Sequence, residues 1–338
     1  MASRWIRSLA LAGLLLCFTV VVLGAYVRLT TAGLGCPDWP GCYGHITPPS
    51  HLDIAENNQV FPNKPIDEGK AWREMIHRYA ASTLGLICVA LAVLAFTTRR
   101  RRLISLPLAW GLVAIIVFQG LLGMLTVTWQ VTPLVVTGHL LFGLTTLSLL
   151  WWLWLSLQPR RPSGDRDSAR LVWRLALIGL IALIVQIALG GWTSTNYADI
   201  ACPDFPKCQD AWWPNADFRD AFVLWRGLGV NYEGGVLSIP ARVAIHLTHR
   251  MGAIVAALML TLAAITTIGR KASLTYVAPA AYAVLIALAL QLTIGITMVL
   301  RGFPLWLATA HTAGAALLLL SVLALLRGAA ATARARPI

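Results

Sequence analysis

Eight apolar stretches, each long enough to cross the hydrocarbon core of a bilayer, run through this 338-residue chain. A helix rises about 1.5 Å per residue, so about 20 apolar residues are enough to span the core. The stretches lie near residues 9–29, 74–98, 105–128, 133–157, 171–193, 241–269, 275–298 and 304–326. Only 12% of the residues are charged, which is about half the share in soluble domains. The sequence therefore predicts an all-α integral membrane protein with eight transmembrane helices.

The distribution of charge predicts the orientation of these helices. The net charge of +13 comes mainly from arginines that cluster at both termini and in the second, fourth and sixth loops. Such clusters are typical of cytoplasmic anchoring loops and do not favour nucleic-acid binding. Both termini are therefore expected to be cytoplasmic, and the two long loops, 30–72 and 194–240, to face outward. The first helix is expected to be retained, because its counterpart in the second half lies in mid-chain.

The chain is an internal repeat. Up to and including the cysteine pairs of the outer loops, matching residues of the two halves are 166 positions apart. After the cysteine pairs they are 172 positions apart. Each half has four helices, an even number, so both halves keep the same orientation in the membrane. We therefore predict two tandem pseudo-symmetric four-helix bundles. Their bounds are residues 1–158 for the N-terminal half, 159–170 for a cytoplasmic linker and 171–338 for the C-terminal half.

Four histidines are expected near the outer ends of the even-numbered helices, as two equivalent pairs. The pairs are His77 with His139, and His249 with His311. Ionisable groups inside membrane spans are costly, so each is a functional hypothesis. Two imidazoles that face each other across a bundle suit a six-coordinate haem iron, whereas zinc usually takes three or four ligands. Packing and proton relay are the alternatives. Arg78 and Arg250 follow two of these histidines, where they could bind haem propionates or anchor lipid headgroups.

One position separates the two halves. Glu74 precedes His77 by three residues, whereas His246 takes the same place before His249. Residues three apart share a helix face, so we expect Glu74 to point toward the same pocket as His77. A carboxylate there can accept protons or stabilise developing positive charge; the alternative is that it only complements the helix dipole. The first half is therefore predicted to hold the reaction site, and the second an electron-transfer or structural haem.

A Gln-x-x-x-Gly pattern recurs in the third, fifth and seventh predicted helices, at 119–123, 186–190 and 291–295. The glycine permits close helix approach and the amide can hydrogen-bond across the interface. We interpret the pattern as contacts between helices, with the lining of a cofactor pocket as the alternative. Under that alternative, Gln119, Gln291 and His246 are candidates to lie just behind the haem ligands.

Each long outer loop carries a cysteine pair, Cys36 with Cys42 and Cys202 with Cys208. On the outer side the pairs meet oxidising conditions, and the intervening residues include two prolines that bend the loop within bridging range. We predict one disulfide in each loop, with a redox role for the first pair as the alternative. Cys17 and Cys88 are expected to be buried packing residues within helices.

The segments GAYVRLTTAGLGCPDWPGC (24–42) and EMIHR (74–78), with the paired histidines and eight helices in two halves, resemble the haem A synthase family of bacterial and mitochondrial membranes. The resemblance covers essentially the whole chain. It implies an oxidoreductase that converts the C8 methyl of haem O to the formyl group of haem A, through two hydroxylations and loss of water. It also implies that Glu74 is the catalytic acid residue, that His77 and His139 flank the substrate haem, and that His249 and His311 bind a resident haem b.

The resemblance further implies a multi-pass protein of the bacterial plasma membrane that takes part in cytochrome oxidase assembly. Its expected partners are haem O, the enzyme that produces haem O, membrane lipid and an electron acceptor that the sequence does not identify; a homo-oligomer is left open. The family often has a second glutamate where this chain has Ala71, so the need for a second acid is open. The main rival is a bis-histidine b-type membrane cytochrome that transfers electrons without modifying haem, and a haem transporter is the third hypothesis.

Overall fold

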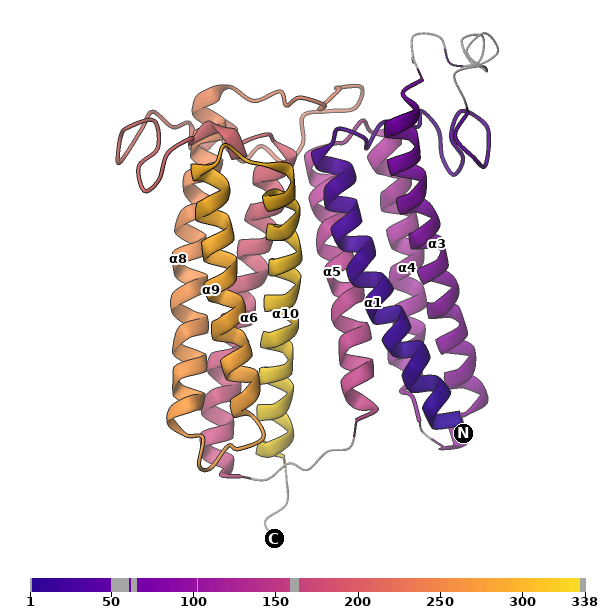
Figure 1. Cartoon of the computed structure of the whole chain (residues 1–338), viewed down its shortest axis with the longest axis vertical. Coiled ribbons are helices and arrows are strands. Elements are labelled where there is room, and N and C mark those ends of the chain that lie inside the picture. The colour runs from indigo at the N-terminus through magenta and orange to yellow at the C-terminus, as the bar shows by residue number, and fades with distance from the viewer. Residues whose placement is uncertain (1, 50–60, 62–65, 102, 159–163, 335–338) are drawn as a thin grey trace. The chain divides into compact units, whose positions relative to one another are not determined.

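A computed structural model describes residues 2–49, 61, 66–101, 103–158 and 164–334 of the chain. Within these residues, eight helices are long and apolar enough to cross a membrane (Figure 1). They are α1 (Ala2–Leu29), α3 (Glu68–Thr97), α4 (Leu106–Thr128), α5 (Pro133–Ser156), α6 (Arg166–Thr195), α8 (Ile239–Gly269), α9 (Ala278–Leu300) and α10 (Leu305–Ala333). Three short helical turns, η2 (Arg99–Arg101), η3 (Asp199–Ala201) and α7 (Phe218–Ala221), lie between them. The prediction of an all-α membrane protein with eight spans is confirmed.

Local sequence signals explain where several helices begin. Asp67 caps α3, because its carboxylate accepts a hydrogen bond from the Lys70 backbone N–H at 2.9 Å. The α4, α8 and α9 helices have proline in their first turn, where its missing N–H costs nothing. Ahead of α6, the Asp165 carboxylate accepts from the Ser168 N–H at 2.8 Å. Residues 166–170 of the expected linker are therefore helical, whereas residues 159–163 lie outside the described part of the chain.

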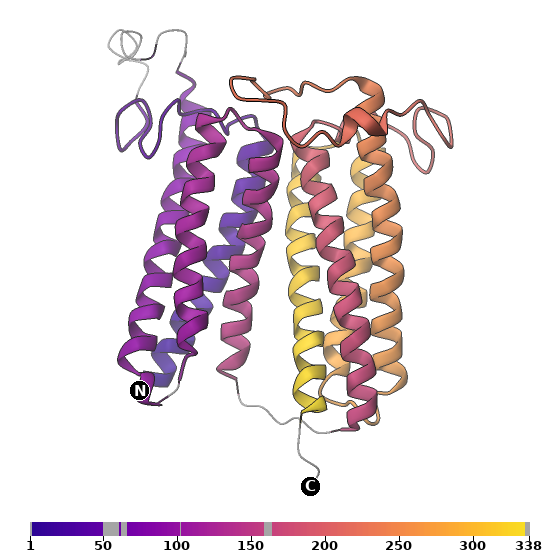
Figure 2. The same ribbon diagram turned by 180° about the vertical axis from the view of Figure 1, so that it is seen from behind.

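The chain divides into two compact units. Helices α1, α3, α4 and α5 run side by side in the first unit, and α6, α8, α9 and α10 do so in the second (Figures 1 and 2). Two segments from later in the chain, Thr195–Tyr197 and Phe222–Leu237, belong to the first unit. The Tyr232 N–H donates to the Gln130 carbonyl at 3.3 Å, and Trp225 packs edge-on against Trp129. The segment thus contacts the turn between α4 and α5.

Within each unit, the paired histidines lie near the helix ends that also carry the cysteine loop. His77 and His139 fall in the first three turns of α3 and α5. His249 and His311 fall in the first three turns of α8 and α10. In each unit a loop with a cysteine pair precedes one of these helices (Figure 1). Each loop is therefore next in the chain to a helix that carries a candidate ligand.

Candidate functional site

The two histidine pairs are brought together as the repeat predicts. His77 of α3 lies within electrostatic range of His139 of α5, and His249 of α8 has the same relation to His311 of α10. All four side chains remain partly exposed, whereas His246 is only 4% exposed. A histidine that is only partly covered by protein can still offer a ring nitrogen to a ligand. The two members of each pair are therefore near enough to be considered together as candidate ligands.

A glycine on the neighbouring helix supports each of the four rings. A Cβ placed on Gly24, Gly190 or Gly295 would come within 3.0, 3.1 or 2.9 Å of the Cε1 atom of the adjacent histidine. The partners are His77, His249 and His311, and the looser fourth contact joins Gly123 to His139 at 3.7 Å. Any larger residue at the three tight positions would push the ring or the helix away. The glycines therefore fix how close each imidazole lies to the next helix.

Three of the four rings leave a buried nitrogen without a partner. The Nδ1 atoms of His77, His139 and His311 are buried and accept or donate no hydrogen bond. Burying such a group unpaired is costly, and an unpaired group in a native protein calls for an explanation. Among the described residues, no three His, Cys, Asp or Glu side chains cluster to hold a bare metal ion. Paired histidines of which at least one keeps an unpaired ring nitrogen fit a haem, because histidine is a common axial ligand of its iron.

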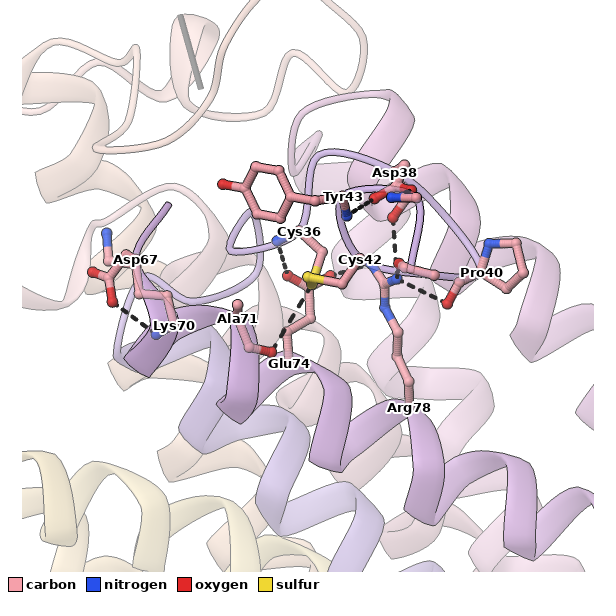
Figure 3. The surroundings of a disulfide bond; sticks show 12 residues. Cys36, Asp38, Pro40, Cys42, Tyr43, Asp67, Lys70, Ala71, Glu74 and Arg78 are labelled. Carbon is pink, nitrogen blue, oxygen red and sulfur yellow. Dashed lines mark hydrogen bonds and ion pairs between the residues drawn. A yellow bond between two sulfur atoms is a disulfide. The ribbon is translucent and has the colours of Figure 1, made fainter. Parts of the chain in front are cut away.

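Glu74 lies beneath the first disulfide loop (Figure 3). Its side chain is buried, with 5% exposure, and one oxygen accepts from the Cys36 backbone N–H at 2.9 Å. The other oxygen forms an ion pair with Arg78, one turn further along α3. These contacts tie the carboxylate to the backbone of the loop and to the arginine of α3.

Arg78 and Arg250 hold their loops in the same way. Arg78 donates to the carbonyl oxygens of Asp38, Pro40 and Gly41, the first two at 3.0 and 3.1 Å (Figure 3). Arg250 donates to the corresponding part of its own loop: Cys202 (3.2 Å), Asp204 (2.7 Å), Pro206 (3.4 Å) and Lys207 (2.7 Å). Propionate binding by these arginines stays a prediction. The contacts with loop carbonyls, which the sequence did not suggest, account for both guanidinium groups here.

Both predicted disulfides are present, with S–S distances of 2.03 Å for Cys36–Cys42 and 1.99 Å for Cys202–Cys208. An aspartate shapes each loop from inside. Asp38 accepts from the backbone N–H groups of residues 43 and 44 at 2.7 and 2.8 Å. Asp204 accepts from residues 209 and 210 at 2.7 and 3.0 Å. The aspartate of the repeated Cys-Pro-Asp motif is therefore a loop-forming residue, a role that sequence reasoning missed. Cys17 and Cys88 are buried and unbridged, as expected.

The first loop packs tightly on α3. Cys36, Cys42 and Ala71 are 0% exposed and form a buried cluster with Tyr43 and Met75. Burial, followed by the charge of Asp38, raises the pKa of the Tyr43 phenol, so this ring stays neutral over the loop. A glutamate in place of Ala71 would have to displace the packing around the disulfide. The small side chain of Ala71 therefore suits this packing. The burial of the disulfide favours a structural role for it.

His246 also contacts the loop of its own unit. Its Nδ1 atom is 2.9 Å from the carbonyl oxygen of Ala198, to which the ring donates. Phe303 packs edge-on against the ring. In the first unit, Glu74 accepts a hydrogen bond from a backbone N–H of the loop. At the equivalent position of the second unit, His246 instead donates a hydrogen bond to a backbone carbonyl. Both Glu74 and His246 help to hold the polypeptide near their cysteine loops.

The glutamines of the repeated pattern contact the histidines, but in two different ways. Gln186 Nε2 is 3.1 Å from His249 Nδ1, and Gln291 Nε2 is 3.2 Å from His311 Nε2. Gln119 Nε2 instead donates to the backbone carbonyl of His139 at 3.0 Å. Gln186 was not predicted among the site residues, although its Gln-x-x-x-Gly spacing matches the other two.

Comparison with known proteins gives matches over almost the whole chain. Residues 7–323 match the COX15-CtaA family, described as cytochrome oxidase assembly protein. A haem A synthase of Shewanella oneidensis is 43% identical over 327 residues, which cover 95% of each chain. The haem A synthase of Rhizorhabdus wittichii is 28% identical, over 95% of this chain and 92% of the relative. That of Caulobacter vibrioides is 27% identical, over 89% of each. The predicted resemblance to haem A synthases, and with it the prediction of an oxidoreductase, is confirmed.

Proposed function

Because the chain belongs to the COX15-CtaA family of cytochrome oxidase assembly proteins, we propose that it oxidises haem O to haem A. The observation that carries this proposal is 43% identity to a haem A synthase over 95% of both chains. The histidine pairs support it, since each offers two partly exposed imidazoles next to a glycine that allows close approach. This activity is favoured over the rival b-type cytochrome, because the relatives share the name of the synthase.

The first unit is the proposed reaction site. His77 and His139 flank the substrate haem O, and their unpaired buried nitrogens support this role. In each of two successive steps, one hydrogen of the C8 methyl is replaced by a hydroxyl group; with water as the source of the oxygen, each step releases two protons and passes two electrons to the electron acceptor. The resulting hydrated aldehyde loses water to give the formyl group. Because the methyl carbon must release protons at each oxidation, a nearby base has a direct use.

Glu74 is the proposed base. It is the acidic residue closest in sequence to a ligand in this unit, three residues before His77 on the same helix. The Cys36 N–H and Arg78 hold the carboxylate in place. A carboxylate fixed in this way can take up a proton from the reacting carbon, or stabilise positive charge that develops beside it.

The second unit is the proposed site of a resident haem b. His249 and His311 would be its axial ligands, and unpaired His311 Nδ1 is consistent with that role. A bis-histidine haem b supplies one-electron transfer when bound. His246 would keep the neighbouring backbone in place through its bond to Ala198 and take no part in the oxidation. Arg250 would hold the second loop over the same end of the bundle.

We further propose that both termini are cytoplasmic and that both disulfide loops face the outer side of the plasma membrane. The arginine clusters at the termini and in the even-numbered loops support this orientation. Haem O would be received from the membrane enzyme that produces it.

The test is pigment analysis of cells that make haem O and have no other haem A synthase. Cells expressing the protein should contain haem A on chromatography of their extracts. Glu74→Gln keeps an oxygen that can accept from the Cys36 N–H but has no ionisable carboxylate. Its haem A output should fall by about 10²–10⁴-fold, the usual contribution of general acid–base catalysis, with haem b content unchanged.

His246→Gln is the matched control, since it alters the equivalent position of the second unit. It should leave haem A output close to that of the wild type. Wild-type protein that binds haem b but leaves haem O unmodified would favour the cytochrome alternative. Normal haem A output from Glu74→Gln would remove Glu74 from the chemistry and leave it a loop contact.

A further inference from the structure

The proposed oxidation releases protons at a place that is largely closed to water. Glu74, the proposed base, is only 5% exposed, and its oxygens contact the Cys36 N–H and Arg78. A base that keeps its proton cannot act in the second hydroxylation, so the proton has to leave Glu74 between the steps. The first unit therefore needs a proton route from Glu74 to water.

Asp67 is an exposed acid at the start of the same face of α3. It precedes Glu74 by seven residues, which is two helical turns, and it caps the helix through the Lys70 N–H. Because Asp67 is exposed, a proton that reaches it can pass to water. Seven residues span about 10 Å along a helix, whereas one hydrogen bond covers about 3 Å. A group between the two carboxylates is therefore needed to connect them.

The Tyr43 side chain lies between these two carboxylates. It belongs to the buried cluster of the first loop together with Ala71, which lies between Asp67 and Glu74 on the helix face. In Figure 3 the Tyr43 ring lies above Ala71, with Asp67 on one side and Glu74 on the other. Both carboxylates are within electrostatic range of the Tyr43 hydroxyl. The ring thus occupies the space that a proton would have to cross.

A phenol hydroxyl can pass a proton on without holding a charge. Its oxygen accepts on one side while its O–H donates on the other, so the ring is neutral before and after the transfer. Burial raises the pKa of the Tyr43 phenol, which disfavours the phenolate. Glu74 can take up a proton while it keeps its bonds to Cys36 and Arg78, because a carboxylate offers about four acceptor sites.

The second unit has different residues at the two positions that would connect its site to water. Gln209 takes the place of Tyr43 at the same point of the disulfide loop, and its side chain donates to a backbone carbonyl of that loop. Ile239 takes the place of Asp67. Neither side chain accepts and releases protons as a hydroxyl and a carboxylate do. Both positions therefore differ between the units together with that of Glu74.

We propose that protons taken up by Glu74 leave the first unit through the Tyr43 hydroxyl and the Asp67 carboxylate. The proposal rests on the proposed role of Glu74 as the base. Glu74 gives its proton to the Tyr43 oxygen, directly or through a bridging water, while the Tyr43 O–H passes its own proton toward Asp67. Asp67 releases a proton to water at the loop end of the unit. Only protons move along this route, and the transfer restores the Glu74 carboxylate for the next hydroxylation.

The experiment measures conversion of added haem O to haem A, in H₂O and in D₂O. It uses membranes of cells that express the full-length protein and have no other haem A synthase. Tyr43→Phe keeps the ring of the buried cluster and removes only the hydroxyl, and Asp67→Asn keeps a good helix cap but has no ionisable group. Tyr79→Phe is the matched control, because the Tyr79 hydroxyl donates to the Ile46 carbonyl of the same loop. The thermal midpoint and the affinity for haem O are measured on each purified protein.

We expect Tyr43→Phe and Asp67→Asn each to slow conversion by about 10–100-fold, at or below the lower end of the range for general acid–base catalysis, because Glu74 itself remains. The ratio of the rates in H₂O and D₂O should rise in both variants, since proton transfer becomes the slow step. The two changes together should slow conversion no more than the more damaging single change, because residues of one route act as a unit. Haem O affinity and the thermal midpoint should stay at wild-type values, and Tyr79→Phe should leave the rate and the isotope ratio unchanged.

A wild-type rate and isotope ratio in Tyr43→Phe or in Asp67→Asn, with Glu74→Gln still inactive, would overturn the route and leave the base in place. Slower conversion with an unchanged isotope ratio, or an equal loss in Tyr79→Phe, would also overturn it, because either result would show that the loop only needs its packing. Wild-type protein that leaves haem O unmodified would overturn the proposed function itself.

Discussion

The two units offer the same pair of histidines but surround them differently. Each ring lies against a glycine of a neighbouring helix in both units, and each cysteine loop is held by an arginine and an aspartate. The second unit adds an amide to both rings and has His246, which bonds to backbone. Among the residues that the structure describes, the first unit has no amide contact to its histidine rings, and it has a buried carboxylate, Glu74. A duplicated scaffold can therefore be specialised by changing what surrounds the ligands while the ligands are kept.

The largest expected effect comes from making the first unit resemble the second. Glu74→His places a histidine where the second unit has His246 and removes the proposed base. Haem A output should fall by at least about 100-fold, within the usual range for the loss of a general base. The reciprocal variant, His246→Glu, should not transfer activity to the second unit. Pigment chromatography checks both, and substantial haem A from Glu74→His would show that the units do not differ in the way described.

Removing each disulfide in turn tests whether both loops only stabilise the fold or whether the first loop also supports activity. Serine at both cysteines of either loop should cost about 2 kcal/mol of stability, the loop-entropy estimate for so short a ring, and lower the thermal midpoint similarly. Haem A output should fall more for the Cys36/Cys42 variant, because Glu74 accepts from the Cys36 N–H. Equal losses of output from the two double variants would contradict this difference. An inactive first double variant with undiminished stability would favour a redox role for that pair.

The sequence predicted the elements that depend on pattern and failed for those that depend on backbone contacts. The eight spans follow from length and apolarity, and the disulfides follow from spacing within loops. The internal repeat predicts His77, His139, His249 and His311 as two pairs, and their role as haem ligands stays a prediction. Arg78 and Arg250, by contrast, bond to backbone carbonyls, which every residue carries and no motif marks. For the same reason the loop-forming role of Asp38 and Asp204 was missed.

Two further features could not be predicted from the sequence: the placement of one loop segment and the atoms that the glutamines contact. The segment Phe222–Leu237 belongs to the first unit, although it follows the second cysteine pair, because its contacts with residues 129 and 130 are made far along the chain. Gln186 shares its spacing with Gln119, yet one contacts a ring and the other only a backbone carbonyl. Spacing places a side chain on a helix face but does not determine which atom it reaches.

The central claim is that the first unit binds the substrate haem and the second the resident haem. Its most direct test is the pigment content of His77→Ala and His249→Ala, each purified from cells that make haem O. We predict that His77→Ala retains haem b and contains neither haem O nor haem A. His249→Ala should lose the low-spin haem b. Loss of haem b from His77→Ala, with haem O or haem A retained, would contradict this assignment of the two units.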